Sequence, residues 1–375
     1  MSYKLALIGC GRIGVWLEDD PLRAKPASHM GGITRIIEQG HVANGLELVA
    51  ACDLDGEKLS RFQTRFGLSP SQTYQDYKEL ISIEKPDIAV IATWTASHRD
   101  IAVYAAQHGV KGIVLEKPTA VSLDQAQEIV ATCQREKVKL VVNHERRWDP
   151  LFRKTKEIIE NKDLGELKLI NGNVLSQSAP IGPWESVLDE AGGGPLLHDG
   201  THLIDMIRYF AGDIATISGH VSRHDRTYGT ETTATAFLRS VNGVNIFIEA
   251  GGMREYFNFE MDLQFERGRI KIGNGICDYY TAQNSNRYSG FKDLIKTAFP
   301  TFPRDTHPFT GAILELIHAM ETDAEPLSSG EDATRAMEII FGIYYSAYLN
   351  GKPVTLPLTT LSGHPLKKMF RTGMI

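Results

Sequence analysis

The sequence predicts an α/β fold in two parts: a doubly wound parallel sheet, followed by a domain with an open-faced, mostly antiparallel sheet. Over the first 145 residues, short apolar runs alternate with amphipathic helical segments, which is typical of the doubly wound arrangement. These apolar runs contain few polar residues, as expected of parallel strands covered on both faces. After Pro150, polar and apolar residues alternate and few helices intervene, which favours a sheet with one exposed face. The predicted domains are residues 1–145 and 146–375.

The first domain is expected to hold five strands, each rich in Val, Ile, Leu and Ala, at residues 4–8, 46–52, 87–92, 112–115 and 139–142. Helical segments are predicted between and after these strands, at residues 32–39, 56–66, 74–81, 97–108 and 122–136. Because each strand is followed by a helix, the strands are expected to run parallel in one sheet.

The second domain is expected to be built from strands with only a few helices. Six runs predict strands, at residues 166–177, 215–222, 232–240, 245–252, 257–266 and 269–275. Asn242-Gly243 separates two of them and is a strong hairpin signal. Two helices are predicted near the end, at about residues 308–320 and 330–349, and a serine caps the second. The stretch 180–195, rich in Pro and Gly, predicts a loop that borders a site.

Composition excludes several classes of function. The chain of 375 residues is 42% apolar with a formal charge of −6, so it has no basic stripe for nucleic acid. No apolar run approaches the roughly 20 residues that span a bilayer. The four cysteines form no C-x-x-C pair, which fits a reducing compartment and argues against a zinc ribbon or a disulfide framework. We therefore expect a cytoplasmic protein without nucleic-acid or membrane partners.

A glycine loop follows the first strand and predicts a dinucleotide site. Gly9, Gly11 and Gly14 form G-x-G-x-x-G around Arg12 and Ile13, between a strand and a helix. The first glycine permits a tight turn, the second lets the backbone approach a pyrophosphate, and the third allows close packing of helix and strand. The helix N-terminus then faces the anion. A plain glycine-rich turn is the structural alternative.

An acidic residue at the end of the second strand completes this signature. Asp53 could bind the adenosine ribose and would repel a 2′-phosphate, which favours NAD over NADP. It follows the glycine loop about twice as far along the chain as the usual 20 residues or so. The excess falls in residues 16–32, which we expect to form an ordered loop. This loop either folds over the cofactor or substrate, or is a surface insertion without a ligand role.

The run 112–115 ends abruptly in Glu116-Lys117-Pro118. The carboxyl ends of parallel strands face the ligand crevice of such a sheet, so Lys117 is expected to be presented to a ligand. Proline restricts the residue before it and stiffens the turn. The structural alternative is that charged residues merely mark the exit of a strand from the core.

Several segments together resemble the Gfo/Idh/MocA family of oxidoreductases: GCGRIG, VIATWTASH, VLEKPTA, NHERRWDP and GGGPLLHDGTHLIDMIRYFAG. The resemblance implies a Rossmann domain, an open-faced sheet that is buried against another subunit in a homodimer or homotetramer, and NAD(P)-dependent chemistry on a sugar, inositol or related polyol. It implies that Lys117 lies beside the nicotinamide and accepts the hydroxyl proton, and that Glu116 orients Lys117 or contacts the cofactor.

The resemblance also implies further ligand contacts in the first domain. The residues expected near the cofactor are Thr93, Trp94 and His98. Those expected near the substrate, or coupling the domains, are Asn143, His144 and Arg147. A structural salt-bridge corner in ERRWDP and an apolar lid formed by Trp94 remain alternatives.

One segment of the second domain departs from the family pattern D-x-G-x-H. His202 matches the final histidine, but His198 occupies the aspartate position and Asp199 follows it. A helix from this segment through Tyr209 would place both histidines on one face. His202 could share the proton transfer, while Asp199 orients it or His198 binds a sugar hydroxyl. A zinc site needs a third ligand, so no metal is predicted. Trp184 is expected either to stack on a sugar ring or to pack in the core.

The sequence therefore predicts an NAD-dependent enzyme that transfers hydride between nicotinamide and a secondary alcohol of a sugar, cyclitol or sugar derivative. One alternative is a glycoside-modifying enzyme that uses transient oxidation by bound NAD. Another is a non-catalytic NAD-binding sensor or regulator.

Overall fold

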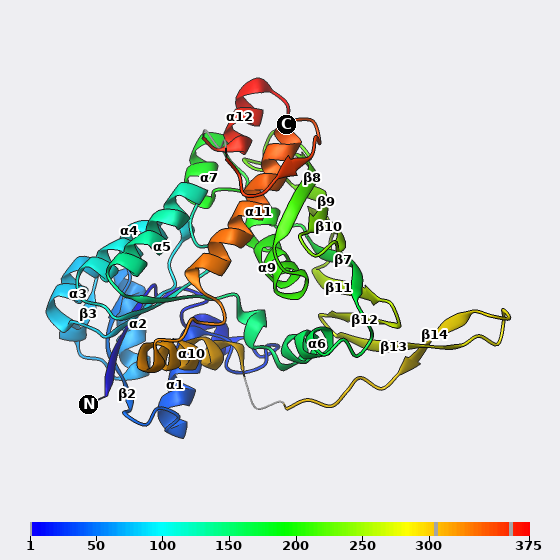
Figure 1. Cartoon of the computed structure of the whole chain (residues 1–375). Helices are drawn as coiled ribbons and strands as arrows, with labels where there is room; N and C mark the ends of the chain where they lie inside the picture. The colour runs from blue at the N-terminus through cyan, green and yellow to red at the C-terminus, as the bar shows by residue number, and fades with distance from the viewer. Residues whose placement is uncertain (1, 304–306, 360–362) are drawn as a thin grey trace. The chain divides into compact units, whose positions relative to one another are not determined.

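The computed structural model describes residues 2–303, 307–359 and 363–375 (Figure 1). The chain forms two compact units. The first comprises Met1–Trp148 and Thr306–Thr334, and the second comprises Asp149–Asp305 and Arg335–Ile375. Within the described ranges, no helix is both long enough and apolar enough to cross a bilayer.

The first unit is built on a six-stranded parallel sheet in the order β3-β2-β1-β4-β5-β6. Its strands are β1 (Tyr3–Ile8), β2 (Leu46–Cys52), β3 (Thr73–Tyr74), β4 (Ile88–Ile91), β5 (Gly112–Leu115) and β6 (Lys139–Val142). Its helices and 3-10 turns are η1 (Trp16–Asp19), α1 (His29–Gln39), α2 (Gly56–Phe66), η2 (Pro70–Gln72), α3 (Tyr77–Glu84), α4 (Thr95–Gln107), α5 (Leu123–Arg135) and η3 (Glu145–Trp148). This strand order is that of a Rossmann fold, as predicted, and its crevice lies where the order reverses between β1 and β4.

The helices of this unit begin at polar caps that the sequence supplies. The side chain of Ser28 caps α1, Asp55 caps α2 and Ser122 caps α5, each by accepting backbone N–H groups of the first turn. Helix α3 begins after its own cap, Asp76, which shifts it three residues from the predicted 74–81. The two residues before that cap region, Thr73–Tyr74, form the short strand β3, which was not predicted.

Helix α10 (Pro308–Thr322) returns from the far end of the chain to the first unit. Its apolar face, from Ala312 to Ile317, lies in the same buried cluster as the strands of the parallel sheet. A Cβ at Gly311 would lie 2.6 Å from the Trp148 side chain, so the two segments pack closely. The predicted domain 146–375 placed this helix with the second sheet. Its amphipathic pattern predicts a buried face but does not say which core covers that face.

The second unit contains a nine-stranded sheet in the order β14-β13-β12-β11-β7-β10-β9-β8-β15. Only β7 and β10 pair in parallel, so the sheet is mixed and mostly antiparallel. Its strands are β7 (Leu167–Ser176), β8 (Ile214–Ser222), β9 (Thr233–Ser240), β10 (Asn245–Gly252), β11 (Asn258–Phe265), β12 (Gly268–Gly273), β13 (Ile276–Asn284), β14 (Lys292–Thr297) and β15 (Val354–Thr355). Figure 1 shows β13 and β14 projecting as a long hairpin beyond the other strands.

The helices that lie wholly in this unit are α6 (Pro150–Glu160), α7 (Trp184–Ala191), α8 (Pro195–His198), α9 (Gly200–Ala211) and α12 (Pro365–Thr372). Most of α11 (Gly330–Tyr348) also belongs to it. Helices α8 and α9 pack on the central strands β7, β9 and β10. The other face of β9 is open, because Thr235, Phe237 and Arg239 are exposed while their alternating neighbours are buried. The predicted one-sided sheet is therefore confirmed.

Residues 180–195 were predicted to form one loop, but they do not. Helix α7 occupies their middle, beginning after Pro183 and ending at Gly192, whose φ of 74° is in the left-handed region. Proline at a helix start and glycine at a helix end are both common, so the same residues that suggested a loop also fit a short helix between two turns.

Candidate active site

The carboxyl ends of five parallel strands bring most of the predicted ligand residues of the first unit to one edge. Gly9 follows β1, Asp53 follows β2, Thr93 comes shortly after β4, Glu116 follows β5 and Asn143 follows β6. This edge borders the crevice at which ligands bind in sheets of this order. The fold therefore gathers these groups at one edge of the sheet.

The glycine loop has the backbone geometry that a pyrophosphate requires. Gly9 has a φ of 104°, and a Cβ there would lie 2.5 Å from the backbone of Ala92. A Cβ at Gly14 would lie 2.2 Å from the carbonyl oxygen of Gly9. At Gly11, by contrast, a Cβ would meet nothing within 4 Å, so space is open in front of this residue. These residues fit a dinucleotide whose pyrophosphate approaches the backbone at Gly11.

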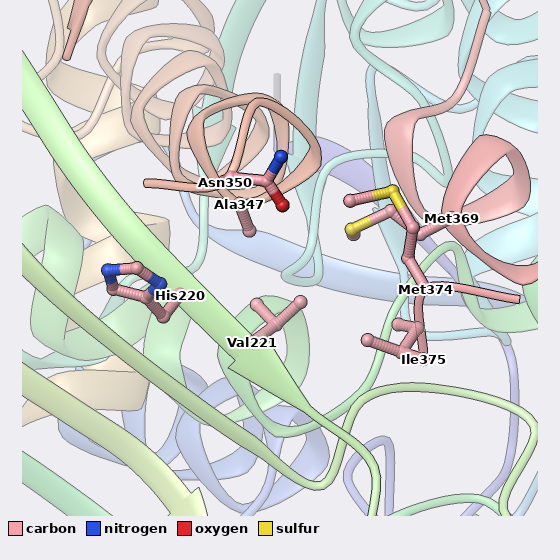
Figure 2. A pocket seen from close by; sticks show the side chains of 7 residues that line it. All are labelled: His220, Val221, Ala347, Asn350, Met369, Met374 and Ile375. Carbon is pink, nitrogen blue, oxygen red and sulfur yellow. The ribbon is translucent and has the colours of Figure 1, made fainter. Parts of the chain in front are cut away.

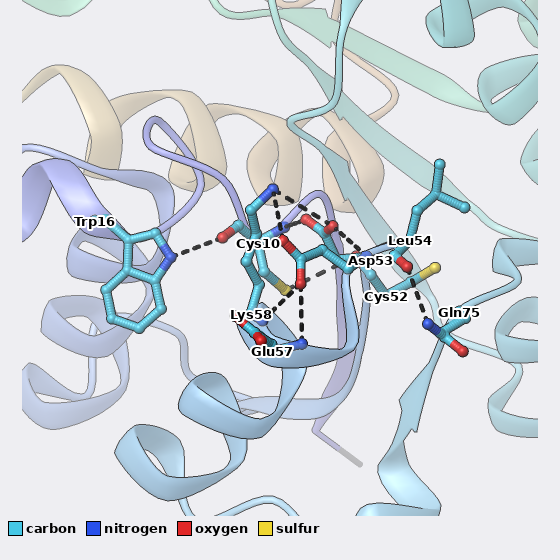
Figure 3. A network of polar contacts seen from close by, with 9 residues as sticks. Cys10, Trp16, Cys52, Asp53, Leu54, Glu57, Lys58 and Gln75 are labelled. Carbon is cyan, nitrogen blue, oxygen red and sulfur yellow. Dashed lines mark hydrogen bonds and ion pairs between the residues drawn. The ribbon is translucent and has the colours of Figure 1, made fainter.

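Asp53 anchors the glycine loop from the end of β2 (Figure 3). One carboxylate oxygen accepts the backbone N–H of Cys10 at 2.8 Å, and the other accepts that of Asp55 at 3.0 Å. The ammonium group of Lys58 lies 3.8 Å from the same carboxylate. Burial and the nearby Asp53 charge raise the pKa of the Cys10 thiol, so this cysteine is neutral. A carboxylate oxygen has two lone pairs, so these bonds still leave acceptor capacity for a ribose hydroxyl.

The extra residues after the glycine loop interrupt the dinucleotide-binding helix without ending it. The backbone N–H of His29 donates to the carbonyl of Ile13, and that of Met30 donates to Gly14. These partners are sixteen positions apart instead of the four of a regular α-helix, so twelve residues loop out and the helix then resumes. This loop accounts for much of the long spacing between the glycine loop and Asp53. Residues 29–32 of the predicted loop 16–32 belong to α1 instead.

The looped-out residues are tied down at both ends. Trp16 donates its indole N–H to the carbonyl of Cys10 at 2.9 Å, and the guanidinium of Arg61 lies 4.0 Å from the centre of its ring (the Trp16 bond is drawn in Figure 3). Glu18 accepts the backbone N–H of Ala27 at 2.8 Å and the hydroxyl of Ser28 at 3.0 Å. The predicted ordered loop is thus folded against the glycine loop and the start of α1.

A buried polar cluster lies beside the predicted catalytic lysine. One oxygen of Glu116 is 2.8 Å from Nε2 of His29 and accepts the side-chain amide of Asn143 at 2.7 Å. The other oxygen accepts the backbone N–H of Lys117 at 3.1 Å. Burial favours a higher pKa for Glu116, but the hydrogen bonds from His29 and Asn143 and the charge of Lys117 outweigh it and lower this pKa. Glu116 is therefore an ionised carboxylate held on three sides.

The sequence analysis did not single out His29. The twelve looped-out residues separate it from the glycine motif, and only the helix register shows that it lies one turn beyond Ile13. Asn143, expected to contact substrate, instead directs its amide to Glu116. Nδ1 of His29 and Oδ1 of Asn143 are buried and have no hydrogen-bond partner among the described residues.

His98, Thr93 and Trp94 meet at the end of β4. The ring of His98 is buried, with Nδ1 3.0 Å from the carbonyl oxygen of Pro118 and Nε2 3.1 Å from that of Thr93. Burial lowers the pKa of His98, so this histidine is neutral at pH 7. Its ring lies between the loop after β4 and the turn that carries Lys117, and its one N–H donates to one of the two carbonyl oxygens. Trp94, in contrast, is 86% exposed beside this loop.

Arg147 and His144 lie deep in the first unit. The Arg147 guanidinium donates to the carbonyl of Leu327 and lies 3.2 Å from the carboxylate of Asp332, and the residue is only 3% exposed. His144 is also buried. These contacts match the structural corner that the sequence analysis kept as an alternative to substrate binding.

In the second unit, the histidine segment forms two short helical pieces joined at Asp199. His198 ends α8, and His202 lies in the first turn of α9, where its backbone N–H donates to the carbonyl of Asp199 at 3.2 Å. The Asp199 carboxylate accepts the Ser178 hydroxyl at 3.1 Å. All three predicted groups are partly exposed. The segment therefore presents two imidazoles and one carboxylate within five residues.

Trp184 and one surface cavity complete the description of this unit. The ring of Trp184 is stacked on Phe370 at 5.5 Å between centroids, which favours the packing alternative over sugar stacking. A cavity of about 290 Å³, shown in Figure 2, contains none of the predicted site residues in its lining. It is lined by His220, Val221, Ala347, Asn350, Met369, Met374 and Ile375. Across the described parts of both units, no three His, Cys, Asp or Glu side chains are grouped so that they could hold a metal ion.

Known proteins resemble this chain in sequence and fold over nearly its whole length. D-apiose dehydrogenase of Paraburkholderia graminis is 31% identical, over 92% of this chain and 88% of its own. The scyllo-inositol 2-dehydrogenase (NAD(+)) of Bacillus subtilis is 25% identical, over 95% and 96% of the two chains. The WlbA dehydrogenase of Bordetella pertussis, solved with NADH and UDP-GlcNAcA, has the same fold with a TM-score of 0.73 at 22% identity, over 96% and 100% of the chains.

Two family models match separate parts of the chain. Residues 3–144 match the oxidoreductase family with an NAD-binding Rossmann fold, and residues 152–271 match the GFO/IDH/MocA C-terminal domain. The chain belongs to the Gfo/Idh/MocA family of NAD-binding oxidoreductases.

Proposed function

We propose that this protein is an NAD-dependent dehydrogenase that oxidises a secondary alcohol of a sugar, cyclitol or sugar derivative, or reduces the corresponding ketone. The observation that carries the proposal is the placement of Lys117 at the carboxyl end of β5, next to the buried Glu116 carboxylate and on the same sheet edge as the glycine loop. Relatives named D-apiose dehydrogenase and scyllo-inositol 2-dehydrogenase support the substrate class.

In the proposed reaction, Lys117 accepts the proton of the carbinol hydroxyl while the hydrogen on the same carbon leaves as hydride. Bound NAD supplies the hydride acceptor, so the products are a ketone, NADH and one proton. The Gly9–Gly14 loop and Asp53 hold the dinucleotide, and Glu116 fixes the backbone of Lys117. His202 shares the proton transfer, and His198 and Asp199 bind substrate hydroxyls.

A substrate panel tests this function directly. Purified protein is incubated with NAD, or separately with NADP, and with pentoses, hexoses, uronic acids, inositols and nucleotide sugars, and NADH formation is followed by absorbance. We expect net NADH formation with at least one compound and a preference for NAD. Conversion of a compound without net NADH favours transient oxidation by bound cofactor. Binding of NAD without any conversion across the panel favours a sensor.

Replacement of Asp53 by alanine is expected to weaken NAD binding about 10- to 100-fold, because charged hydrogen bonds contribute roughly 1.5–3 kcal/mol each. The ratio of the KM for NAD to the KM for NADP, which is below one for an enzyme that prefers NAD, should rise towards one, because the carboxylate no longer repels a 2′-phosphate. Glu57→Gln, in the first turn of the adjacent α2, is the matched control and should leave both constants within about twofold. An unchanged cofactor preference in Asp53→Ala would contradict the assignment.

We also propose that the open face of the second sheet is buried between two copies of the chain. Phe237 on β9 and Phe247 on β10 are opposite each other in the ladder, with ring centroids 5.0 Å apart, and are 37% and 47% exposed. Paired exposed aromatic side chains on one sheet face are typical of an interaction surface. We expect light scattering to detect a dimer or tetramer of the wild type and a monomer of Phe247→Glu. Leu22→Glu, at a residue 94% exposed in the first unit, should behave as wild type. A monomeric wild-type protein would rule the proposal out.

A further inference from the structure

Glu231 has a buried carboxylate with no exposed surface and lies two residues before the start of strand β9. Its oxygens accept three hydrogen bonds from two distant segments. The backbone N–H of Gly194 donates at 2.9 Å, that of Leu196 at 3.2 Å, and the hydroxyl of Tyr344 on α11 at 2.9 Å. A buried carboxylate that receives this many donors holds them firmly, because losing any one leaves a charged acceptor less satisfied in a dry environment.

The glycine triplet at 192–194 fits closely around this carboxylate. A Cβ at Gly194 would lie 2.4 Å from the Glu231 carbonyl oxygen, and a Cβ at Gly193 would lie 2.6 Å from the Tyr344 hydroxyl. The carbonyl of Gly192 accepts a hydrogen bond from Nε2 of His364. Gly193 and Gly194 thus let the main chain approach Tyr344 and Glu231 where any side chain would collide.

The same peptide units carry the histidine segment. The carbonyl of Gly194 accepts the backbone N–H groups of Leu197 and His198, and that of Pro195 accepts the N–H of Asp199. The N–H group of Gly194 therefore donates to Glu231, while the carbonyl of the same residue accepts the backbone N–H of His198. Because α8 has only four residues, displacement of Gly194 and Leu196 would move His198 and the start of α9 with them.

We propose that Glu231 is a positioning residue: its carboxylate fixes the Gly194–Leu196 backbone and, through it, the imidazoles of His198 and His202. That this placement matters for turnover rests on the proposed function. The hydrogen bonds from the backbone N–H groups of Gly194 and Leu196 to the Glu231 carboxylate, called the clamp below, do not depend on that function.

The charge of Glu231 decides the strength of the clamp. Burial raises the pKa of Glu231 to about 7, against the opposing hydrogen bonds from Tyr344, Gly194 and Leu196. Tyr344 is the titratable group that contacts Glu231, and the ring of His364 stacks on Tyr344 in turn. Asp189 and Lys367 act on the charge of His364. Burial raises the pKa of Tyr344 well above its usual value and lowers that of His364 to about 4, so both stay neutral near pH 7. Protonation turns one carboxylate oxygen into a donor, so the clamp loosens as the pH falls through about 7.

Hydrogen exchange followed by mass spectrometry on the full chain, without ligands, tests the clamp. Peptides covering residues 192–199 are measured between pH 5.5 and 8.5, and rates are corrected for intrinsic exchange. In the wild type we expect protection to fall about tenfold on acidification, as for loss of a charged hydrogen bond. In Glu231→Gln, the protection of these peptides should stay at every pH at the low level that the wild type shows at acidic pH. Tyr344→Phe should move the midpoint to higher pH, because it removes a donor that favours the carboxylate. Tyr345→Phe, the neighbouring phenol, is the matched control and should behave as wild type.

Turnover gives the second readout. At pH 8, with the best compound of the substrate panel, Glu231→Gln should lower kcat about tenfold and leave the KM for NAD within about twofold. Wild-type protection in Glu231→Gln, an unshifted midpoint in Tyr344→Phe, or an undiminished kcat in a Glu231→Gln protein that has lost protection would each overturn the proposal. If Glu231→Gln fails to fold, the Tyr344→Phe midpoint decides. If the exchange results hold and the panel yields no turnover, the proposed function fails while the clamp stands.

Discussion

Lys117→Ala is expected to lower kcat about 10²- to 10⁴-fold while the Kd for NAD stays within a few-fold. General base catalysis contributes typically 10²–10⁴-fold, and the deleted side chain carries the amine that is proposed to take the hydroxyl proton. Glu116 bonds to the backbone N–H of Lys117, so the turn keeps this bond when the side chain is removed. Turnover is measured with the best compound of the panel, and NAD binding by titration calorimetry on the same preparation.

Lys111→Ala is the matched control because it changes a lysine next to the opposite end of the same strand. Lys111 is exposed and pairs with Asp87 at 2.7 Å, and an exposed pair contributes at most about 1 kcal/mol to stability. Its turnover should stay within about twofold of wild type. A Lys117→Ala protein with wild-type kcat would remove Lys117 from the chemistry. Equal loss of turnover and NAD binding would make it a cofactor residue instead.

Five of the strands of the first sheet were predictable because each is a mostly apolar run bounded by polar or glycine residues. Leu46–Cys52, Gly112–Leu115 and Lys139–Val142 coincide with the predicted ranges. The hairpin β13–β14 was missed because many of its side chains are polar and exposed on both faces, which removes the alternating signal. Its pairing comes from the backbone ladder, which a hydrophobic pattern does not report.

The site residues were predictable as types at strand ends, but the direction of their hydrogen bonds was not. Asn143 and His98 were expected to contact ligands, and the structure shows the side-chain amide of Asn143 donating to Glu116 and the His98 ring between two backbone carbonyls. A motif fixes which groups gather at an edge. Which of them contact a ligand and which orient a neighbour depends on tertiary distances of about 3 Å that sequence spacing does not contain.

His29→Ala is expected to lower both the stability of the first unit and kcat. The ring of His29 is fully buried, 2.8 Å from the Glu116 carboxylate and in edge contact with Phe309. Removing this hydrogen-bond partner leaves the buried Glu116 carboxylate less satisfied, which typically costs about 1–3 kcal/mol and more where the acceptor is charged. For a unit of this size, we expect the unfolding midpoint to fall by about 5–10 °C. His41→Ala, an exposed histidine just beyond the end of α1, is the control and should leave the midpoint within about 1 °C.

The pH dependence of stability separates loss of packing from loss of the hydrogen bond. Because the pKa of Glu116 is lowered in the folded protein, its carboxylate stabilises the fold above the ordinary glutamate value of about 4.3, and this contribution is lost as the pH falls through the lower folded-state value. Without His29 the folded-state pKa rises towards the ordinary value, so the part of the stability that is lost on acidification should become smaller. His29→Gln, whose amide can still donate to the carboxylate, should restore part of both this pH dependence and kcat, whereas His29→Leu should restore only packing. Equal kcat in the Gln and Leu variants would mean that His29 acts on the site through packing alone, since only the Gln side chain can keep Glu116 oriented beside Lys117.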